Sequence, residues 1–377
     1  MLPLTPSRVP TSGLIQIGLL LTITALLTGG VIPVQEFGTT ERSHASLAEA
    51  TQLSSGVPTA SAPVASILFL GDVLLARDVE RHQQRYGYAY PFAGLRFSDV
   101  APEPYVFANF EAAIPQVHQP TPNMSTRFSV APTALPALRA AGVSHVSLAN
   151  NHSFDFGSDG YQHTRDMLAQ NGITPFGHPS DLSAADVQYI ALSSGQTVGV
   201  VGINAVFTTV SAQTLQTLME SVESRSDLQI AYIHWGTEYR TQHDETQQKL
   251  ASMLVGAGFD LIIGHHPHVV QDIDLIAGVP VVYSLGNHIF DQYFSTAVQE
   301  GLMVSLQATE SFTLTLHPVT SVASRAQPQV QDATARADFL VEVARRSHPA
   351  LRDQILAGQL TVLTPLAHTT KTAMMVE

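Results

Sequence analysis

Two short apolar runs in the second half of the chain each end in glycine and then in side chains that can bind a metal ion. The first run covers residues 261–263 and ends at Gly264; the second covers residues 279–285 and ends at Gly286. The polar residues that follow are His265, His266 and His268 after the first run, and Asn287, His288 and Asp291 after the second. Apolar runs of this kind are typical of buried strands, and α/β sheets bind ligands at the carboxyl ends of their strands. We therefore expect a metal site at one edge of a sheet.

Earlier strands also end in polar side chains, and helices alternate with them. Predicted strands cover residues 67–70, 106–111, 145–148, 196–204 and 228–233, and predicted helices cover residues 79–85, 132–141, 161–170, 211–223 and 245–257. The strand ends supply Asp72, Asn109, Glu111, Asn151, His152 and His234. This alternation indicates an α/β fold. Residues 302–307 and 312–316 then alternate as in an antiparallel hairpin, and residues 334–346 are predicted to be helical.

The composition restricts the kinds of site and partner. The 377 residues include 16 histidines and no cysteine, so a metal site must use nitrogen and oxygen ligands, and no disulfide can form. The formal net charge is −13 and no run of basic residues occurs, which argues against nucleic acid as a partner.

The N-terminal region predicts a membrane anchor and a tether. After a short tail, residues 1–12, residues 13–34 carry no charge and are long enough to cross a bilayer as one transmembrane helix; a cleaved signal peptide is the alternative. Residues 35–65 are rich in Ser, Thr, Ala, Gly and Pro, as in a flexible linker. We expect a single-pass protein of the cell membrane whose domain, residues 66–320, is extracytoplasmic, or a secreted protein after cleavage. Residues 321–377 are expected to form a C-terminal extension.

Six motifs give the chain a family resemblance. FLGDVLLAR, NFE, SLANNHSFDFG, IHWGTEY, IIGHHPHVVQ and YSLGNHIFDQ occur in this order. The set resembles the CapA family of capsule-synthesis proteins, a branch of the calcineurin-like metallophosphoesterase superfamily, over roughly residues 66–318. The resemblance implies a four-layer α/β/β/α sandwich, attachment to the outside of the membrane, and a role in synthesis or export of poly-γ-glutamate or a related capsule polymer.

The same resemblance implies a metal site with one or two divalent ions. The implied metal ligands are Asp72, Glu111, Asn151, His234, His266 and His268, with Glu111 at the position of a bridging aspartate. His152 matches the histidine that contacts the substrate phosphate. Mixed nitrogen and oxygen ligation favours Mn, Fe or Zn. The chain departs from the superfamily pattern at Leu74, where a further histidine ligand is usual. Two alternatives therefore stay open: a catalytic metal site, and a site that binds a ligand without catalysis.

Further residues are candidates for contacts with substrate or with a ligand side chain: Arg77, Asn109, Glu238, His265 and Asn287. Arg77 could pair with an anionic substrate or face solvent on a helix. Glu238 could hydrogen-bond a ligand histidine or bind substrate, and His265 could orient a neighbouring group or face solvent. Trp235 and Tyr239 could line the cleft or belong to the core. Residues expected to have no part in ligation are Asn150, which would turn the backbone, His288, and the surface histidines His44, His82, His118, His163 and His178.

Three functions remain open at this point. The first is a metal-dependent hydrolase or transferase acting on a phosphoester or on an amide of an anionic polymer. The second is a non-catalytic accessory subunit that binds polymer or stabilises a membrane-bound synthase. The third is a structural protein of the envelope. The partners expected from the resemblance are an anionic capsule polymer or its precursor, and synthase subunits in the membrane.

Overall fold

The computed structural model describes residues 65–308 and 311–362 of the chain. The predicted anchor at residues 13–34 and almost all of the predicted linker lie outside these ranges. Within the described ranges, no helix is long and apolar enough to cross a membrane.

The first sheet is built around a central strand that begins the described fold. Its order is β14-β13-β12-β1-β2-β3-β4, with β11 also paired to β1 and β15 to β13. The strands are β1 (Ser66–Val73), β2 (Pro104–Phe110), β3 (Val143–Ser147), β4 (Thr174–Phe176), β11 (Asn287–Ile289), β12 (Glu300–Ala308), β13 (Phe312–Thr320), β14 (Gln329–Val330) and β15 (Gln359–Val362). The pairs from β1 to β4 are parallel, whereas β12 runs antiparallel to both β1 and β13.

The second sheet has the order β5-β6-β7-β8-β10-β9. Its strands are β5 (Gln188–Ala191), β6 (Thr197–Asn204), β7 (Leu228–His234), β8 (Leu261–His265), β9 (Ile273–Ile276) and β10 (Val279–Val282). The four inner strands are parallel, and the two edge strands are antiparallel to their neighbours.

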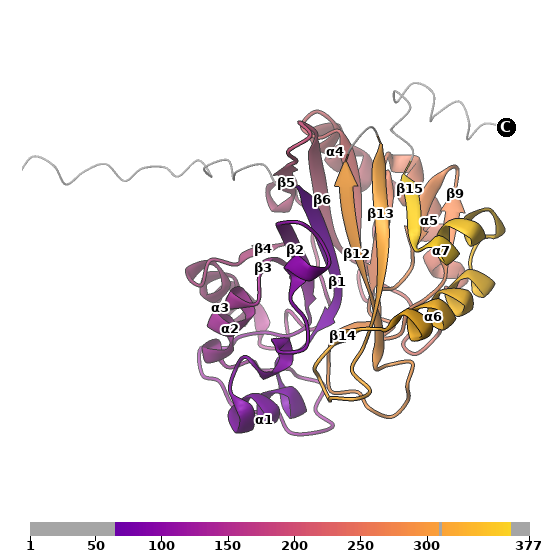
Figure 1. Cartoon of the computed structure of the whole chain (residues 1–377). Helices are drawn as coiled ribbons and strands as arrows, with labels where there is room; N and C mark the ends of the chain where they lie inside the picture. Colours follow the sequence, from indigo (N-terminus) through magenta and orange to yellow (C-terminus); the bar gives the residue numbers. More distant parts are fainter. Residues whose placement is uncertain (1–64, 309–310, 363–377) are drawn as a thin grey trace, which may run out of the picture. The chain divides into compact units, whose positions relative to one another are not determined.

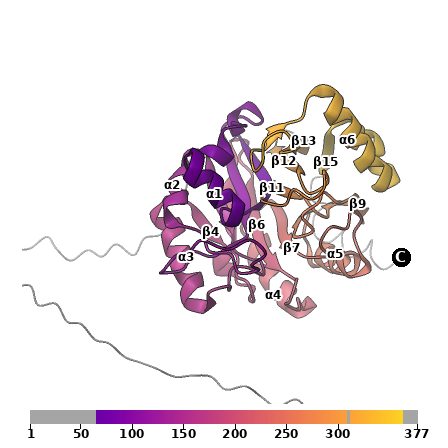
Figure 2. The same cartoon turned by 90° about the horizontal axis from the view of Figure 1, so that it is seen from below.

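The first five α-helices cover the outer faces of the two sheets, and the last two pack on apolar residues between the sheets (Figures 1 and 2). The α-helices are α1 (Arg77–Tyr86), α2 (Leu135–Ala140), α3 (Gly157–Gln170), α4 (Ala212–Glu223), α5 (Glu245–Ala257), α6 (Ala333–Arg346) and α7 (Arg352–Ala357). Short 3-10 helices are η1 (Tyr90–Phe92), η2 (Phe97–Asp99), η3 (Pro132–Ala134), η4 (Ala184–Asp186) and η5 (Pro349–Leu351). The first three α-helices share an apolar cluster with the first sheet, and α4 and α5 share one with the second.

A third apolar cluster fills the space between the sheets. Along β1, Ile67 and Phe69 point into this central cluster, whereas Leu68 and Leu70 point toward α1–α3. Successive side chains of a strand alternate between faces, so a strand covered on both faces must be apolar throughout. This explains the continuous apolar run at residues 67–70. The α/β class predicted from the sequence is confirmed.

Most predicted elements are present, with shifted ends. The helix predicted over residues 245–257 coincides with α5, where Asp244 and Gln247 form a capping box and Gly258 ends the helix with a φ of 113°. The strand predicted over residues 279–285 stops at Val282. Beyond residue 320 the chain continues the same fold, because β15 pairs with β13 and α6 packs on the central cluster.

Candidate metal centre

The carboxyl ends of four parallel strands bring the polar residues of both sheets together. Asp72 at the end of β1 lies in register with Asn109 of β2, and His234 at the end of β7 with His265 of β8. Gly71 permits close approach of the loop before β11, because a Cβ atom there would lie 2.0 Å from the Gly286 carbonyl oxygen. Asn109 Nδ2 of β2 lies 3.1 Å from His234 Nδ1 of β7, so the two sheets meet at one polar edge.

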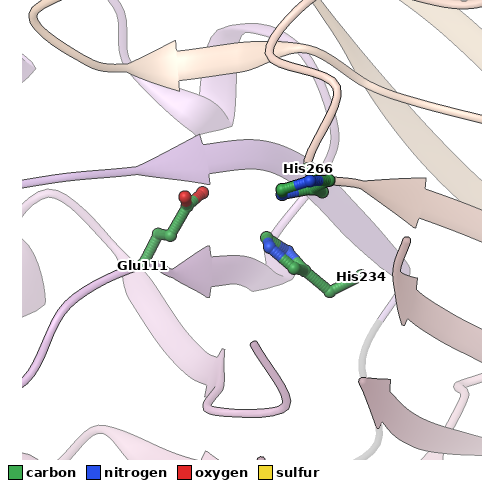
Figure 3. Close-up of side chains that lie close together, drawn as sticks. All are labelled: Glu111, His234 and His266. Atoms are coloured by element: carbon green, nitrogen blue, oxygen red, sulfur yellow. The ribbon is translucent and has the colours of Figure 1, made fainter. Parts of the chain in front are cut away.

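Two groups of three buried side chains at this edge could each hold a metal ion. Glu111, His234 and His266 form one group (Figure 3), and Asp72, Glu111 and His268 form the other. Within each group, one ligand atom per residue lies within 4.8 Å of the others. Glu111 belongs to both groups, so its carboxylate could serve as a ligand in either of them.

Asp72 is held as an ionised carboxylate. Its Oδ1 accepts a hydrogen bond of 2.8 Å from Asn109 Nδ2, and its Oδ2 accepts one of 3.3 Å from the backbone N–H of His266. Burial alone would raise the pKa of Asp72, but contacts with His268, His265 and Asn109 outweigh it and lower the pKa. His268 thus contributes most to keeping Asp72 in its charged form, and Asn109 fixes the position of Oδ1.

Glu111 gives the strongest indication of a bound cation. Its side chain is fully buried, and among the described residues neither carboxylate oxygen has a hydrogen-bond partner. The nearest basic atoms are Nε2 of His152 and Nε2 of His268, each 3.7 Å from Oε1. Burial raises the pKa of Glu111 well above its usual value. Because a buried carboxylate without partners is costly, the residues around Glu111 fit a site for a divalent ion.

His234 and His266 are the neutral imidazoles of the first group. His234 Nε2 lies 2.7 Å from Asn151 Oδ1, and its Nδ1 lies 3.1 Å from Asn109 Nδ2, which places Asn151 beside the same group. Burial and the neighbouring histidines lower the pKa of His234 well below its usual value, and burial lowers that of His266 to about 4. Neutral imidazole is the form that binds metal ions.

The loop of His266 and His268 has unusual backbone angles. The φ angles are 96° at His266 and 59° at His268, in the left-handed region that L-residues other than glycine rarely adopt. Strain of this kind persists where the surrounding structure enforces it, as at binding sites. Here it turns both imidazoles toward Glu111.

His268 differs from the other histidines because it lies between two carboxylates. Its Nδ1 is 3.0 Å from Asn287 Oδ1 and 3.4 Å from Asp72 Oδ2. Burial lowers the pKa of His268, but the charges of Glu111 and Asp72 outweigh burial and raise it to about 9. Asn287 is itself held, since its Nδ2 donates to Gln292 and to the Val298 carbonyl.

The raised pKa of His268 predicts that metal binding depends on pH. In protein stripped of metal, His268 carries a proton at neutral pH, and an ion that binds there must displace it. Affinity for Mn or Zn at the second group should therefore rise about tenfold per pH unit up to about pH 9 and then level off. Titration calorimetry in buffers of different ionisation enthalpy should show release of about one proton per ion at neutral pH. An affinity that is flat across this range would contradict the assignment.

His152 lies beside the two groups without belonging to either. Its Nδ1 is 3.0 Å from Asp155 Oδ2, its ring stacks on Phe128 at 4.0 Å, and its Nε2 faces Glu111. Asn150 holds the loop as expected, because its Oδ1 accepts from the backbone N–H of His152 and its Nδ2 donates to the Phe110 carbonyl.

The remaining candidates have varied surroundings. Arg77 does not face solvent; it is half-buried, forms an ion pair with Asp291, and lies over the Phe128 ring. Glu238 is exposed, and its negative charge raises the pKa of His268 from the surface. His265 does not face solvent either: it is buried, with Nε2 3.1 Å from the Leu70 carbonyl oxygen.

The two aromatic residues after β7, Trp235 and Tyr239, differ in burial and therefore in role. Trp235 belongs to the core, where its Nε1 donates to the Tyr283 carbonyl over 2.8 Å. Tyr239 is 44% exposed, and its ring centroid lies 6.0 Å from that of His268, so it lines the mouth of the site.

Leu74 and the other histidines lie outside the two groups of candidate ligands. His288 is buried against Phe97, and burial lowers its pKa to about 3. Leu74 is fully buried in the apolar cluster on the α1–α3 side and offers no ligand atom. Four histidines expected at the surface are half-buried instead: His82, His118, His163 and His178. His82 stacks on Tyr90 and His178 packs edge-on against Phe154, whereas His118 contacts Glu80 and His163 the Ile114 carbonyl oxygen. His44 lies outside the described residues.

Comparisons with known proteins give a consistent picture. A family model described as "Bacterial capsule synthesis protein PGA_cap" matches residues 66–292, which is more than half of the chain. The "PGA biosynthesis protein CapA" of Bacillus subtilis is 26% identical and covers 81% of this chain and 84% of its own length. The "Capsule biosynthesis protein CapA" of Bacillus anthracis is 27% identical over 63% of this chain and 62% of its own. A "Probable polyglutamine synthesis accessory protein" of Mycobacterium tuberculosis is 27% identical over 42% of this chain and 48% of its own.

Proposed function

The chain belongs to the bacterial capsule synthesis protein family PGA_cap, and from this premise we propose that it acts in synthesis or export of polyglutamate or a related capsule polymer through a divalent-metal site. The relatives from the two Bacillus species carry names that refer to this process. The reaction class that the site supports best is metal-dependent hydrolysis or transfer at a phosphoester, or at an amide of an anionic polymer.

Glu111 is the observation that supports the metal-dependent reading. One buried carboxylate with two unpartnered oxygens lies between two sets of nitrogen and oxygen donors. The residues that would hold the ions are Asp72, Glu111, Asn151, His234, His266 and His268. Mn, Fe or Zn suits such donors. When bound, divalent ions would supply a water of lowered pKa and stabilise the negative charge that develops on the phosphoryl or carbonyl oxygen of the substrate.

The chain's own residues would orient the substrate and move protons. His152 Nδ1 is held by Asp155, which leaves Nε2 free on the Glu111 side to give a proton to a leaving group or to hold an anionic oxygen. Tyr239 lines the entrance beside His268. Ligands at the strand ends of two packed sheets also support our placing of the fold among metallophosphoesterase-like sandwiches.

A non-catalytic accessory role is the second candidate, and Leu74 favours it. A leucine at this position contributes no ligand, so the group that contains Asp72 has one donor fewer than the superfamily pattern implies. The protein also carries a net charge of −13, which repels an anionic polymer unless bound cations offset it. Such a protein would use its site to bind polymer, or would stabilise the synthase subunits in the membrane.

Metal analysis combined with a substrate screen separates these functions. Purified wild-type protein is compared with a Glu111→Gln variant for bound Mn, Fe and Zn and for turnover of phosphoesters and γ-glutamyl amides. Bound metal with turnover that the variant lacks supports the enzyme. Bound metal without turnover, together with co-purification of membrane subunits by both proteins, supports the accessory role. Wild-type protein with no more metal than the variant would overturn both metal-based readings.

We also propose that residues 13–34 anchor the protein in the cell membrane with the domain outside the cytoplasm. An uncharged segment of this length suits one membrane-spanning helix. The full chain should stay with membranes after an alkaline carbonate wash, whereas a variant without residues 2–34 should not. Release of the domain into the medium, with an N-terminus beyond residue 34, would show cleavage instead.

A further inference from the structure

Phe128 is a buried aromatic residue whose backbone is fixed to the segment that carries Glu111. Its carbonyl oxygen accepts a hydrogen bond of 3.0 Å from the N–H of Ala113, and the N–H of Val130 donates to the Ala113 carbonyl over 3.0 Å. Ala113 follows Glu111 by two residues. The backbone of Phe128 is therefore fixed relative to the backbone of the segment that carries Glu111, and side-chain motion does not change this.

Two contacts then connect Phe128 to His152. The two rings stack, with centroids 4.0 Å apart and planes at 25°. The backbone N–H of Phe128 also donates to Asp155 Oδ2 over 2.6 Å, and the same oxygen lies 3.0 Å from His152 Nδ1. Phe128 thus contacts the face of the His152 ring with its own ring. Its backbone N–H also holds the Asp155 carboxylate that lies against Nδ1 at the edge of the imidazole.

The Phe128 ring is itself confined by its neighbours. The Arg77 guanidinium carbon lies 4.5 Å from the ring centroid, and the Phe290 ring packs edge-on at 6.3 Å. Phe128 is only 5% exposed, so there is little space into which the ring could rotate. The face that it presents to His152 is consequently well defined.

From these contacts we infer that Phe128 is a positioning residue for His152. It fixes the plane of the imidazole by stacking, and through its N–H it fixes the Asp155 oxygen that holds Nδ1, so that Nε2 faces Glu111. Groups that act on a substrate must be held to within a fraction of an ångström and some tens of degrees, and contacts to neighbouring side chains supply that precision. The part that His152 plays in turnover rests on the proposed function; its orientation by Phe128 does not.

The variant Phe128→Leu tests the stacking contact, since it keeps an apolar side chain and the backbone N–H but removes the ring. We expect kcat for a phosphoester to fall about tenfold, with KM and metal content unchanged. Phe128→Tyr, which retains the ring, should restore most of the rate. Phe154→Leu is the matched control, because Phe154 lies two residues after His152 and packs on Tyr161 and His178 instead; its kcat should equal that of the wild type.

A measurement that does not depend on turnover tests the positioning role of Phe128 separately from the proposed function. Nitrogen-15 NMR of the histidine side chains, with His152 identified by its loss in His152→Ala, reports which ring nitrogen carries the proton. Wild type and Phe154→Leu should show His152 as one tautomer protonated at Nδ1, because Asp155 Oδ2 holds that nitrogen. In Phe128→Leu the Asp155 carboxylate stays in place, but the unstacked imidazole can turn away from it, so the signals should move toward an average of two tautomers. If the wild type has no turnover but Phe128→Leu shifts these signals, the proposed function fails and the positioning role stands. Unchanged signals and unchanged kcat in Phe128→Leu would overturn the positioning role. If Phe128→Leu fails to fold, Phe128→Met is judged by the same two outcomes.

Discussion

Replacement of Glu111 by glutamine is expected to remove divalent ions from both ligand groups at once. Glutamine has nearly the same size and shape as glutamate, so packing is preserved while the charge that the two groups share is lost. Loss of a directly ligating carboxylate should weaken binding by at least about 100-fold, the upper range for loss of a residue that only supports a ligand. Metal analysis of the variant after dialysis against metal-free buffer should find only traces, and phosphoester turnover should be absent.

Two further variants test whether loss of both ions is specific to Glu111, the residue that the two ligand groups share. His234→Ala changes one group only, so it should lose the ion at that group and keep the other. Glu245→Gln removes an exposed carboxylate on α5, outside both groups, and should bind metal as the wild type does. A Glu111→Gln protein that retains as much metal as Glu245→Gln would mean that the buried carboxylate does not bind the ions, and the metal-dependent reading would fail with it.

The candidate site could be found from the sequence because its residues follow buried strands. Parallel strands bring their carboxyl ends to one edge, so Asp72, Glu111, His234 and His266 come together even though they are far apart in the chain. The family motifs then indicated which of the polar residues at those ends to choose. That Glu111 is shared by the two ligand groups could be predicted only from the strand pattern and the family motifs together.

Several features were beyond the reach of sequence patterns. The strands β4, β9, β11 and β15 have four residues or fewer and, unlike β8 and β10, contain no continuous apolar run, so their places depend on pairing with other strands. Phe128 lies in a loop, and no spacing connects it to His152; the backbone hydrogen bonds with Ala113 and the hydrogen bond from its N–H to Asp155 hold it there. Arg77 reads as an exposed helix residue because its ion-pair partner, Asp291, is more than 200 positions away.

The second large effect concerns His152, whose replacement by alanine should abolish most turnover and leave metal binding intact. His152 is in neither ligand group, so the ions should remain. Loss of a group that donates a proton or holds an anionic oxygen lowers kcat by about 10²–10⁴-fold. The measurement is turnover of a phosphoester together with metal analysis of the same preparation.

The choice of ester distinguishes the two ways in which His152 can act. If Nε2 donates a proton to the leaving group, the loss in His152→Ala should be large for an alkyl phosphoester and small for a nitrophenyl ester, whose leaving group needs no proton. If Nε2 instead holds an oxygen of the phosphoryl group, both esters should lose rate equally, because both develop the same charge there. Asp155→Asn, which weakens the hold on Nδ1 without removing the imidazole, should show the same pattern with a smaller loss. Equal turnover by the wild type and His152→Ala with both esters would assign the activity to a different site.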